Sequence, residues 1–258
     1  MYIKKMIRRF GTFTLALGFD PRRFWLTLKN LPIFIWQLII CLFENKKSFE
    51  FRLLPILSDK GMAGGVAKGH YFHQDLWAAR LIYRASPVRH IDVGSRIDGF
   101  ISHLLVFRSV EVVDIRYLET GVQGLNFIQA DMMSSSHGIK PADSVSCLHT
   151  LEHFGLGRYG DDLNLKGWEL GLESLCSLVK PGGYLYLSVP IGSRQIIEMN
   201  AQRIFFSETI PNMLKQVGFQ LQSYSVVEDN GEFSENIELQ SYTGNFGCGC
   251  YVFKRDSV

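Results

Sequence analysis

The segment His149-Thr150-Leu151-Glu152-His153 gathers two imidazoles and one carboxylate within five residues. It follows the apolar run Ser144–Leu148, which has the composition of a buried strand. Imidazole titrates near neutral pH, so a histidine here can take a proton from an acceptor group while the glutamate orients a ring. Alternatively, Glu152 and His153 cap the following turn and His149 is a packed core histidine. The candidate catalytic residues are His149, His153 and Glu152.

A glycine turn between a strand and a helix marks a second candidate site, in the stretch HIDVGSRIDGF, His90–Phe100. The apolar run Val88–Val93 predicts a strand, and Gly94 predicts a turn. The spacing of the apolar residues after Gly94 predicts a helix. Free backbone N–H groups and the helix dipole at such a turn favour the polar part of a nucleotide-like ligand. Twenty residues after Gly94, strand Val110–Val113 ends in Asp114, which suits the two hydroxyls of a ribose.

The glycine spacing indicates which ligand this turn binds. A dinucleotide fold has the pattern G-x-G-x-x-G, in which the middle glycine lets the backbone approach a pyrophosphate. Here the series reads Gly94, Arg96, Gly99. A side chain as large as that of Arg96 disfavours NAD and FAD. S-adenosylmethionine has a ribose but no pyrophosphate, so a single glycine at the strand end suffices for it.

One further strand end adds a polar group. Strand Asn126–Gln129 is followed by Asp131, whose carboxylate suits an adenine amino group, with an ordinary loop aspartate as the alternative. Ligands of doubly wound sheets bind at the carboxyl ends of the strands, where Gly94, Asp114 and the His149 segment also fall. The candidate cofactor-binding residues are Asp92, Gly94, Ser95, Asp114, Ile115, Ala130, Asp131 and His149.

Substrate contacts are expected from three polar segments. The first is the start of a predicted helix within Gly69–Ala85, the second a loop rich in arginine before Ser207, and the third the acidic, amide-rich loop Glu228–Asn245. The alternative is a solvated first turn and ordinary surface loops. The candidate substrate-binding residues are His70, Tyr71, His73, Gln74, Asp75, Arg194, Asn200, Arg203, Asp229 and Asn230.

Metal and redox chemistry have weaker signals. Glu152 and His153 with Asp161 or Asp162 could hold a divalent ion, but no spacing is specific, so the metal ligands remain unknown. Five scattered cysteines indicate a reducing compartment without a disulfide framework. Cys248 and Cys250 lie on one face of a predicted strand, where structural thiols are favoured over a metal or redox site.

The order of predicted elements indicates an α/β domain with a doubly wound parallel sheet that ends in an antiparallel hairpin. The remaining predicted elements are helices Leu165–Val179 and Ser207–Val217, a helix stop at Pro181-Gly182-Gly183, and strands Tyr184–Pro190, Gln220–Val227 and Cys248–Lys254. We divide the 258 residues into an N-terminal helical extension, 1–67, and a main domain, 68–258.

The N-terminal extension differs in charge from the rest of the chain. Residues 1–50 hold nine Lys or Arg against three Asp or Glu, whereas the remainder is mildly acidic, which argues against nucleic-acid binding. The apolar run Leu31–Phe43 would span roughly 20 Å as a helix, short of the roughly 30 Å hydrocarbon core. Residues 1–43 are therefore expected either to lie on a membrane surface or to pack on the domain or a second subunit, as in a homodimer.

These motifs in this order resemble the class I S-adenosylmethionine-dependent methyltransferases. The resemblance is carried by DVGS, VVDIR, QADM, DSVSCLHTLEH and LVKPGGYLYLSVP, over roughly residues 68–254. It implies a Rossmann-like, seven-stranded, mostly parallel sheet with a C-terminal antiparallel hairpin. Carried over, Asp92 and Gly94 form the first cofactor motif, Asp114 binds ribose and Asp131 adenine. Arg96 and Asp98 stand where the commonest members have glycines.

More narrowly, GHYFHQDLWAAR, HIDVGSRIDGF, CLHTLEHFGLGRYGD, PIGSRQIIEMNAQRIF and the DNGEF loop resemble the family called domain of unknown function 268. Many of its bacterial members are associated with polysaccharide and O-antigen biosynthesis. The resemblance implies an O-methyltransferase for a sugar hydroxyl of a surface glycan or lipid-linked saccharide, in the cytoplasm or at the cytoplasmic face of the inner membrane. The alternatives are a non-catalytic scaffold in a glycan-assembly complex and a nucleotide-sugar-modifying enzyme.

Overall fold

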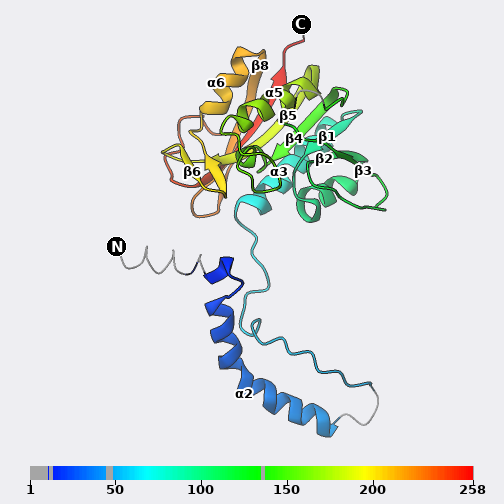
Figure 1. Cartoon of the computed structure of the whole chain (residues 1–258), viewed down its shortest axis with the longest axis vertical. Helices are drawn as coiled ribbons and strands as arrows, with labels where there is room; N and C mark the ends of the chain where they lie inside the picture. Colours follow the sequence, from blue (N-terminus) through cyan, green and yellow to red (C-terminus); the bar gives the residue numbers. More distant parts are fainter. Residues whose placement is uncertain (1–10, 12–13, 45–48, 135–136, 258) are drawn as a thin grey trace. The chain divides into compact units, whose positions relative to one another are not determined.

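The structure is a computed structural model that describes residue 11 and residues 14–44, 49–134 and 137–257. The chain divides into two compact units, Met1–Val66 and Ala67–Val258 (Figure 1). The predicted division into residues 1–67 and 68–258 differs from these limits by one residue.

The second unit alternates strands with helices. Its helices are α3 (His70–Ala85), η1 (Ile97–Ile101), α4 (Ser102–Leu105), η2 (Leu151–His153), α5 (Gly167–Leu178) and α6 (Thr209–Gln216). Its strands are β1 (His90–Val93), β2 (Val110–Asp114), β3 (Leu125–Gln129), β4 (Ala142–Leu148), β5 (Val179–Ile191), β6 (Ile196–Glu198), β7 (Gln202–Ile204), β8 (Phe219–Val227), β9 (Phe233–Ser234) and β10 (Gly247–Arg255).

One sheet of eight described strands has the order β3-β2-β1-β4-β5-β10-β8-β9. Strands β1 to β5 pair in parallel, whereas β10 pairs antiparallel with both β5 and β8. The expected mostly parallel α/β sheet with a C-terminal antiparallel hairpin is therefore confirmed. The two-residue strand β9 is an addition to the seven strands expected.

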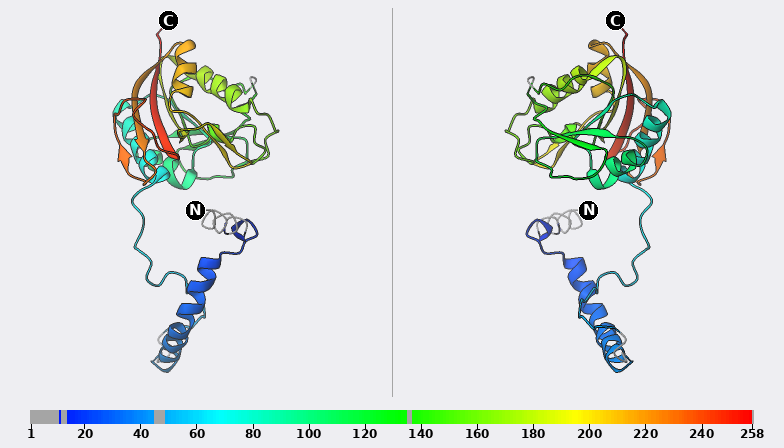
Figure 2. Two further views of the ribbon diagram at one scale, coloured as in Figure 1. Left: turned by 90° about the vertical axis from the view of Figure 1, so that its left-hand side faces the viewer. Right: turned by 90° about the vertical axis from the view of Figure 1, so that its right-hand side faces the viewer.

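Helices cover both faces of this sheet (Figure 2). Helix α3 and the η1–α4 segment bury Ile82 and Leu104 against one face. Helices α5 and α6 bury Leu175 and Leu214 against the other. Each fully buried side chain of this size stabilises the fold by about 1.5–3 kcal/mol, so the two layers fix the sheet between them. The packed core therefore fixes the positions of the loops at the carboxyl ends of the strands.

Three local features differ from the sequence-based expectation. Helix α5 ends at Leu178, close to the predicted helix stop, but strand β5 begins at Val179 and runs through Pro181-Gly182-Gly183, where a turn was predicted. A register shift between Ala142 and Ser144 of β4 absorbs this irregular start. The segment after Gly94 opens as the π-helix η1 rather than as an α-helix. The loop predicted before Ser207 contains the antiparallel hairpin β6–β7.

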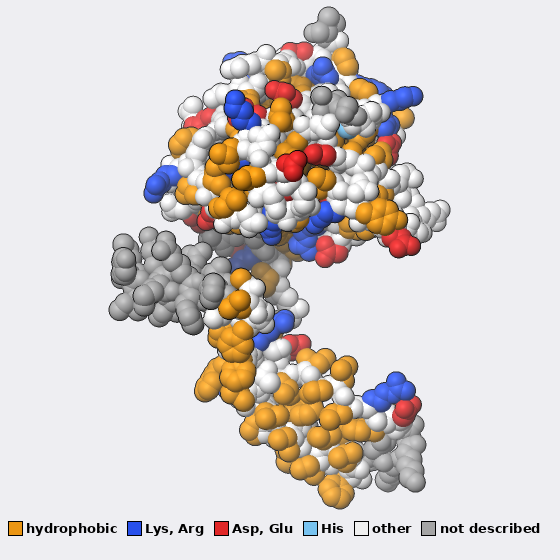
Figure 3. Space-filling view, in the orientation of Figure 1, with side chains coloured by type: hydrophobic (Ala, Val, Ile, Leu, Met, Phe, Trp, Pro, Cys, Tyr) orange, Lys and Arg blue, Asp and Glu red, His pale blue; other side chains and the backbone are white. Residues whose placement is uncertain are grey.

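The first unit contains α2 (Pro21–Glu44), 24 residues long. Asp20 Oδ1 accepts hydrogen bonds from the backbone N–H groups of Arg22 and Arg23, which caps its start. At about 1.5 Å per residue the helix is about 36 Å long, so the 13-residue apolar helix expected from the sequence was too short. Large apolar side chains are exposed along it (Figure 3).

By length and composition α2 could cross a membrane. The predicted membrane-surface or dimer contact of residues 1–43 falls partly on residues 1–10 and 12–13, which lie outside the described residues. That contact stays a prediction.

Candidate active site

A cavity of about 310 Å³ opens at the carboxyl ends of β1, β2 and β4. This volume falls in the usual range for small-molecule sites. The cavity brings together most of the predicted cofactor-binding residues with the two predicted catalytic histidines. The predicted residues that line it are Tyr71, Gly94, Ser95, Asp114, Ile115, Ala130, Asp131, His149 and His153. Asp92 and Glu152 lie beneath its surface, both fully buried.

Gly94 is required by both its backbone and its surroundings. Its φ of 69° lies in the left-handed region, which side chains other than glycine rarely adopt. A Cβ atom here would lie 2.3 Å from Cγ2 of Thr150. The N–H group of Gly94 donates to the Val113 carbonyl at 2.8 Å, which fixes the turn to the end of β2. The backbone can therefore approach a ligand closely at this point.

Asp92 holds the glycine turn from below. Its Oδ1 accepts hydrogen bonds from the hydroxyls of Ser95 (2.7 Å) and Ser146 (2.5 Å), and its Oδ2 accepts from the Ser95 N–H (3.0 Å). Burial raises the pKa of Asp92 to about 7, although these three hydrogen bonds oppose the shift. Asp92 is thus a positioning residue for Ser95 rather than a cavity wall.

Asp114 stands in the cavity at the end of β2, as predicted, but it has a partner there. Arg116 donates from Nε to Oδ1 (3.0 Å) and from Nη2 to Oδ2 (2.7 Å), and its N–H also reaches Oδ1 (2.8 Å). The guanidinium also lies 4.4 Å from the centre of the Tyr159 ring. Because about half of the Arg116 side chain is exposed, this ion pair contributes about 0–1 kcal/mol and can be exchanged for a ligand.

Asp131 lines the cavity beside Asp114. Its Oδ1 accepts a hydrogen bond from the Met133 N–H at 2.8 Å, which closes the loop after β3. The Ala130 N–H donates to the Asp114 carbonyl at 3.1 Å, so the two strand ends are joined at this edge. The register of β2 with β3 therefore places both carboxylates on one side of the cavity.

Arg96 and Asp98, which stand where glycines are commonest, do not fill the cavity. Arg96 forms an ion pair with Asp98 at 3.1 Å, and its guanidinium lies 4.8 Å from the centre of the Tyr71 ring. About half of the Arg96 side chain is exposed, and 79% of that of Asp98. Both side chains therefore form part of the cavity rim.

His149 follows β4 in an unusual conformation. Its φ of 50° is in the left-handed region, and its N–H donates to both the carbonyl and the hydroxyl of Ser188 (3.0 and 3.1 Å). A non-glycine residue in this region carries strain of about 1–2 kcal/mol, and such strain gathers at functional sites. Packing against β5 therefore holds this histidine at the cavity wall.

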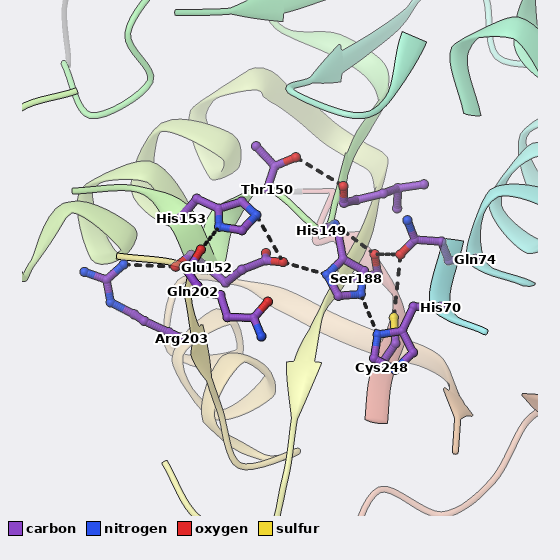
Figure 4. Close-up of polar contacts among 12 residues, drawn as sticks. His70, Gln74, His149, Thr150, Glu152, His153, Ser188, Gln202, Arg203 and Cys248 are labelled. Atoms are coloured by element: carbon purple, nitrogen blue, oxygen red, sulfur yellow. Dashed lines mark hydrogen bonds and ion pairs between the residues drawn. The ribbon is translucent and has the colours of Figure 1, made fainter. Parts of the chain in front are cut away.

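The electrostatics of His149 are set by a buried carboxylate. Its Nδ1 lies 2.6 Å from Oε1 of Glu152 (Figure 4). Burial alone would lower the pKa of His149, but Cys248 and Glu152 outweigh it and raise that pKa to about 10. We attribute the rise to Glu152, because burial raises the pKa of the Cys248 thiol and keeps it neutral.

His153 differs from His149 in its charge. Its Nδ1 donates to the Ala201 carbonyl at 2.6 Å, which leaves the lone pair on Nε2. Burial lowers its pKa below the usual 6.5, so the ring is neutral at pH 7. Nε2 lies 3.8 Å from Oε1 of Glu152. Oε2 of Glu152 has no hydrogen-bond partner among the described residues.

The start of α3 brings only part of its polar cluster to the cavity. Tyr71 lines it, and Nδ1 of His70 lies 3.1 Å from Nε2 of His149 behind the wall. Gln74 accepts a hydrogen bond from the Ser188 hydroxyl at 2.7 Å. Asp75 packs against Gly99 and His73 stacks on a ring of β9, so neither lines the cavity.

The predicted loop residues take structural positions. Arg203, predicted to contact substrate, is buried and donates to the carbonyls of Glu152, Phe154 and Leu165, which makes it a positioning residue for η2. Asp229 accepts hydrogen bonds from the Tyr242 hydroxyl and two backbone N–H groups. The remaining loop candidates, Asn230, Arg194 and Asn200, are exposed and do not line the cavity.

The metal set suggested by the sequence does not assemble as written. Asp161 accepts hydrogen bonds from three backbone N–H groups (2.8, 3.1 and 3.2 Å), which lower its pKa although burial would raise it. Asp162 does not line the cavity. Within the described part of the chain, the residues placed to share an ion are His70, His149 and Cys248.

Sequence reasoning missed four residues. Arg116 and Tyr159 line the cavity, and Ser188 and Cys248 support His149 from β5 and β10. The signals for the first two were an arginine two residues after Asp114 and a tyrosine in the glycine-rich loop. The pattern of Cys248 and Cys250 favoured structural thiols and did not reveal that Cys248 lies near His149, because that proximity depends on the sheet order.

Comparisons with known proteins bear on the fold and on one segment. The family described as "Caenorhabditis protein of unknown function, DUF268" matches residues 124–245. No curated protein matches the sequence. The structure is similar to that of the [4+2]-cyclase SpnF, with a TM-score of 0.51 and 13% identity over 78% of this chain and 92% of that chain.

It is also similar to the N-methyltransferase NodS from Bradyrhizobium japonicum WM9 in complex with S-adenosyl-L-homocysteine. The TM-score is 0.50 and the identity 11%, over 72% of this chain and 88% of that chain. At such identities the likeness shows the fold. The second unit therefore has the class I methyltransferase fold, and the resemblance to the family DUF268 is confirmed for residues 124–245.

Proposed function

We propose that the protein is an S-adenosylmethionine-dependent O-methyltransferase. The observation that carries the proposal is the cavity itself. It has the glycine turn and two carboxylates on one side, and a neutral buried histidine on the other. In the class I fold this edge of the sheet is where a nucleotide-like ligand binds. The acceptor we propose is a sugar hydroxyl of a surface glycan or lipid-linked saccharide.

The residues present fit this cofactor. Gly94 offers a backbone without a Cβ, and Asp114 and Asp131 offer carboxylate oxygens for ribose hydroxyls and an adenine amino group. Arg96 turns to the rim and leaves the cavity open. When bound, the cofactor supplies a methyl group on a sulfonium, which leaves as a neutral thioether. Asp114 must give up one hydrogen bond from Arg116, which costs about 0–1 kcal/mol.

His153 is the residue best placed to remove the acceptor proton. Its hydrogen bond to Ala201 keeps Nε2 as an acceptor, and its lowered pKa keeps the ring neutral. As the acceptor oxygen bonds to the methyl carbon, its proton passes to Nε2 of His153. The Glu152 carboxylate, 3.8 Å away, stabilises the imidazolium that forms. His149 then serves as an oriented wall residue rather than as the base.

Two observations support a sugar as the acceptor. One is the sequence resemblance to a family associated with glycan biosynthesis. The other is the lining, in which the Tyr71 and Tyr159 rings lie near polar groups. Aromatic rings pack against the apolar face of a sugar while polar groups bind its hydroxyls. Membrane association through α2 would bring the enzyme to lipid-linked acceptors.

The test is transfer of a labelled methyl group to the host's surface glycan. We expect His153→Gln to lower kcat by about 10²–10⁴-fold with little change in cofactor affinity. We expect the acid limb of the wild-type kcat profile to lie below pH 6.5. His103→Gln, which changes an exposed histidine, is the matched control. Full activity of His153→Gln would refute its role as base, and no transfer to any glycan would favour the scaffold alternative.

A further inference from the structure

Three side chains that can ligate a metal ion converge behind the cavity wall. His70 begins α3, His149 follows β4, and Cys248 lies in β10 (Figure 4). Their ligating atoms all lie within 4.8 Å of one another. We propose that His70, His149 and Cys248 bind one Zn²⁺ ion. This proposal does not depend on methyl transfer, because it concerns only these side chains and the groups that hold them.

The two imidazoles already face each other. Nδ1 of His70 lies 3.1 Å from Nε2 of His149, and the rings are stacked with an angle of 19° between their planes. A tetrahedral ion with nitrogen ligands at about 2.0–2.1 Å separates them by about 3.4 Å. Two ring nitrogens this close must share either a proton or a metal ion. The two nitrogens would therefore move about 0.3 Å further apart to admit the ion.

Glu152 supports His149 as carboxylates support metal-bound histidines. Its Oε1 contacts Nδ1 of His149 at 2.6 Å, which orients the ring so that Nε2 faces His70. Glu152 is fully buried, and no ion pair joins it to a lysine or arginine within the described ranges. A divalent ion bound through His149 would keep a positive charge beside this buried carboxylate when the imidazole gives up its proton.

Cys248 decides which metal the site prefers. Its side chain is fully buried, and its Sγ lies 3.6 Å from Oε1 of Gln74. One thiolate with two imidazoles favours Zn²⁺ over Mg²⁺ or Ca²⁺, which prefer oxygen ligands. On binding, the Cys248 thiol and the imidazole pair release their protons to solvent as the S–Zn and N–Zn bonds form. Three protein ligands leave a fourth position for water or another oxygen.

The test is metal binding by the full-length chain after removal of metal with a chelator. We expect one Zn²⁺ per chain, measured by competition with a chromophoric chelator. We expect Co²⁺ to give a thiolate-to-cobalt charge-transfer band. Cys248→Ser should remove this band and weaken Zn²⁺ binding by more than about 100-fold. Cys250→Ser is the matched control, because its Sγ lies 3.8 Å from that of Cys248 but outside the ligand group, and it should retain both.

A second variant keeps the proposal testable if Cys248→Ser does not fold, as judged by circular dichroism. Glu152→Gln leaves all three ligands in place and should weaken Zn²⁺ binding by about 10–100-fold. A wild-type protein that binds neither Zn²⁺ nor Co²⁺ would overturn the proposal, and the facing nitrogens would then share a proton. Unchanged binding by folded Cys248→Ser would equally overturn it. Methyl transfer enters neither readout.

Discussion

Replacing Asp92 by Asn should remove the contribution that Asp92 makes to the pH dependence of folding stability between pH 4 and pH 8. Asp92 is fully buried, and the three donors that reach its carboxylate come from Ser95 and Ser146. Asp75 lies near enough to raise its pKa further, and His90 contacts Ser146 from the other side at 3.0 Å. No described cation forms an ion pair with Asp92, so its charge is expensive in the folded state.

The magnitude follows from the pKa of Asp92. Burial raises this pKa from 3.8 to about 7, so between these pH values the folded state holds a proton that the unfolded state has released. The contribution of Asp92 to the free energy of unfolding must then fall as pH rises from 3.8 to 7, by at most about 4 kcal/mol, and stay level above that. Asn can replace the neutral acid if its oxygen accepts from Ser95 N–H and its amide donates to the serine hydroxyls.

The assay is urea unfolding of the full chain at several pH values. Burial lowers the pKa of His70 to about 4 and that of His90 to about 3, so both give the opposite slope below pH 6.5. These two histidines contribute equally in the wild type and in Asp92→Asn. The difference in the free energy of unfolding between the two proteins therefore reports on Asp92 alone. We expect Asp92→Asn to match the wild type near pH 4, to exceed it increasingly as pH rises to 7, and to keep this advantage at pH 8. Asp98→Asn, at an exposed position, should follow the wild type. Parallel curves for Asp92→Asn would refute the reasoning.

Three further outcomes are expected. Gly94→Ala should lower the free energy of unfolding, measured by urea unfolding, by about 1–3 kcal/mol. The new Cβ would lie 2.3 Å from Thr150 Cγ2, and φ at this position is 69°. Adding Thr150→Ala should relieve only part of this loss, because it removes the clash but not the backbone strain. Arg203→Met should cost about 3 kcal/mol in the same measurement, because three carbonyls lose their donor, whereas exposed Arg194→Met should change little. Arg116→Met should tighten S-adenosylmethionine binding, measured by calorimetry, by up to about fivefold, because it frees the Asp114 carboxylate from its ion pair with Arg116. Weaker binding would show that Arg116 itself holds the ligand.

The strand ends could be predicted because their signals are local. A buried parallel strand is a short apolar run, and Gly94, Asp114 and Asp131 each lie at the end of a strand or within two residues of it. The parallel sheet then brings these residues to one edge whatever the loops do. The cofactor side of the cavity was therefore predictable from the order of runs and polar residues.

The acceptor side depends on contacts between distant segments. His70 and His149 are 79 positions apart in the sequence, and Gln74 and Cys248 are 174 positions apart. No local sequence pattern therefore predicts either contact. Arg203 is an arginine in a polar loop by sequence, yet the β6–β7 hairpin turns it inward to three carbonyls. Only the packed structure distinguishes such a buried guanidinium from a ligand for phosphate.

The most direct test of the account is calorimetric titration of the full chain with S-adenosylhomocysteine. We expect saturable one-to-one binding, a clear loss of affinity for Asp114→Asn, and no binding of NAD under the same conditions. Wild-type protein that binds no S-adenosylhomocysteine at millimolar concentration, or that binds it equally well without the Asp114 carboxylate, would contradict the account.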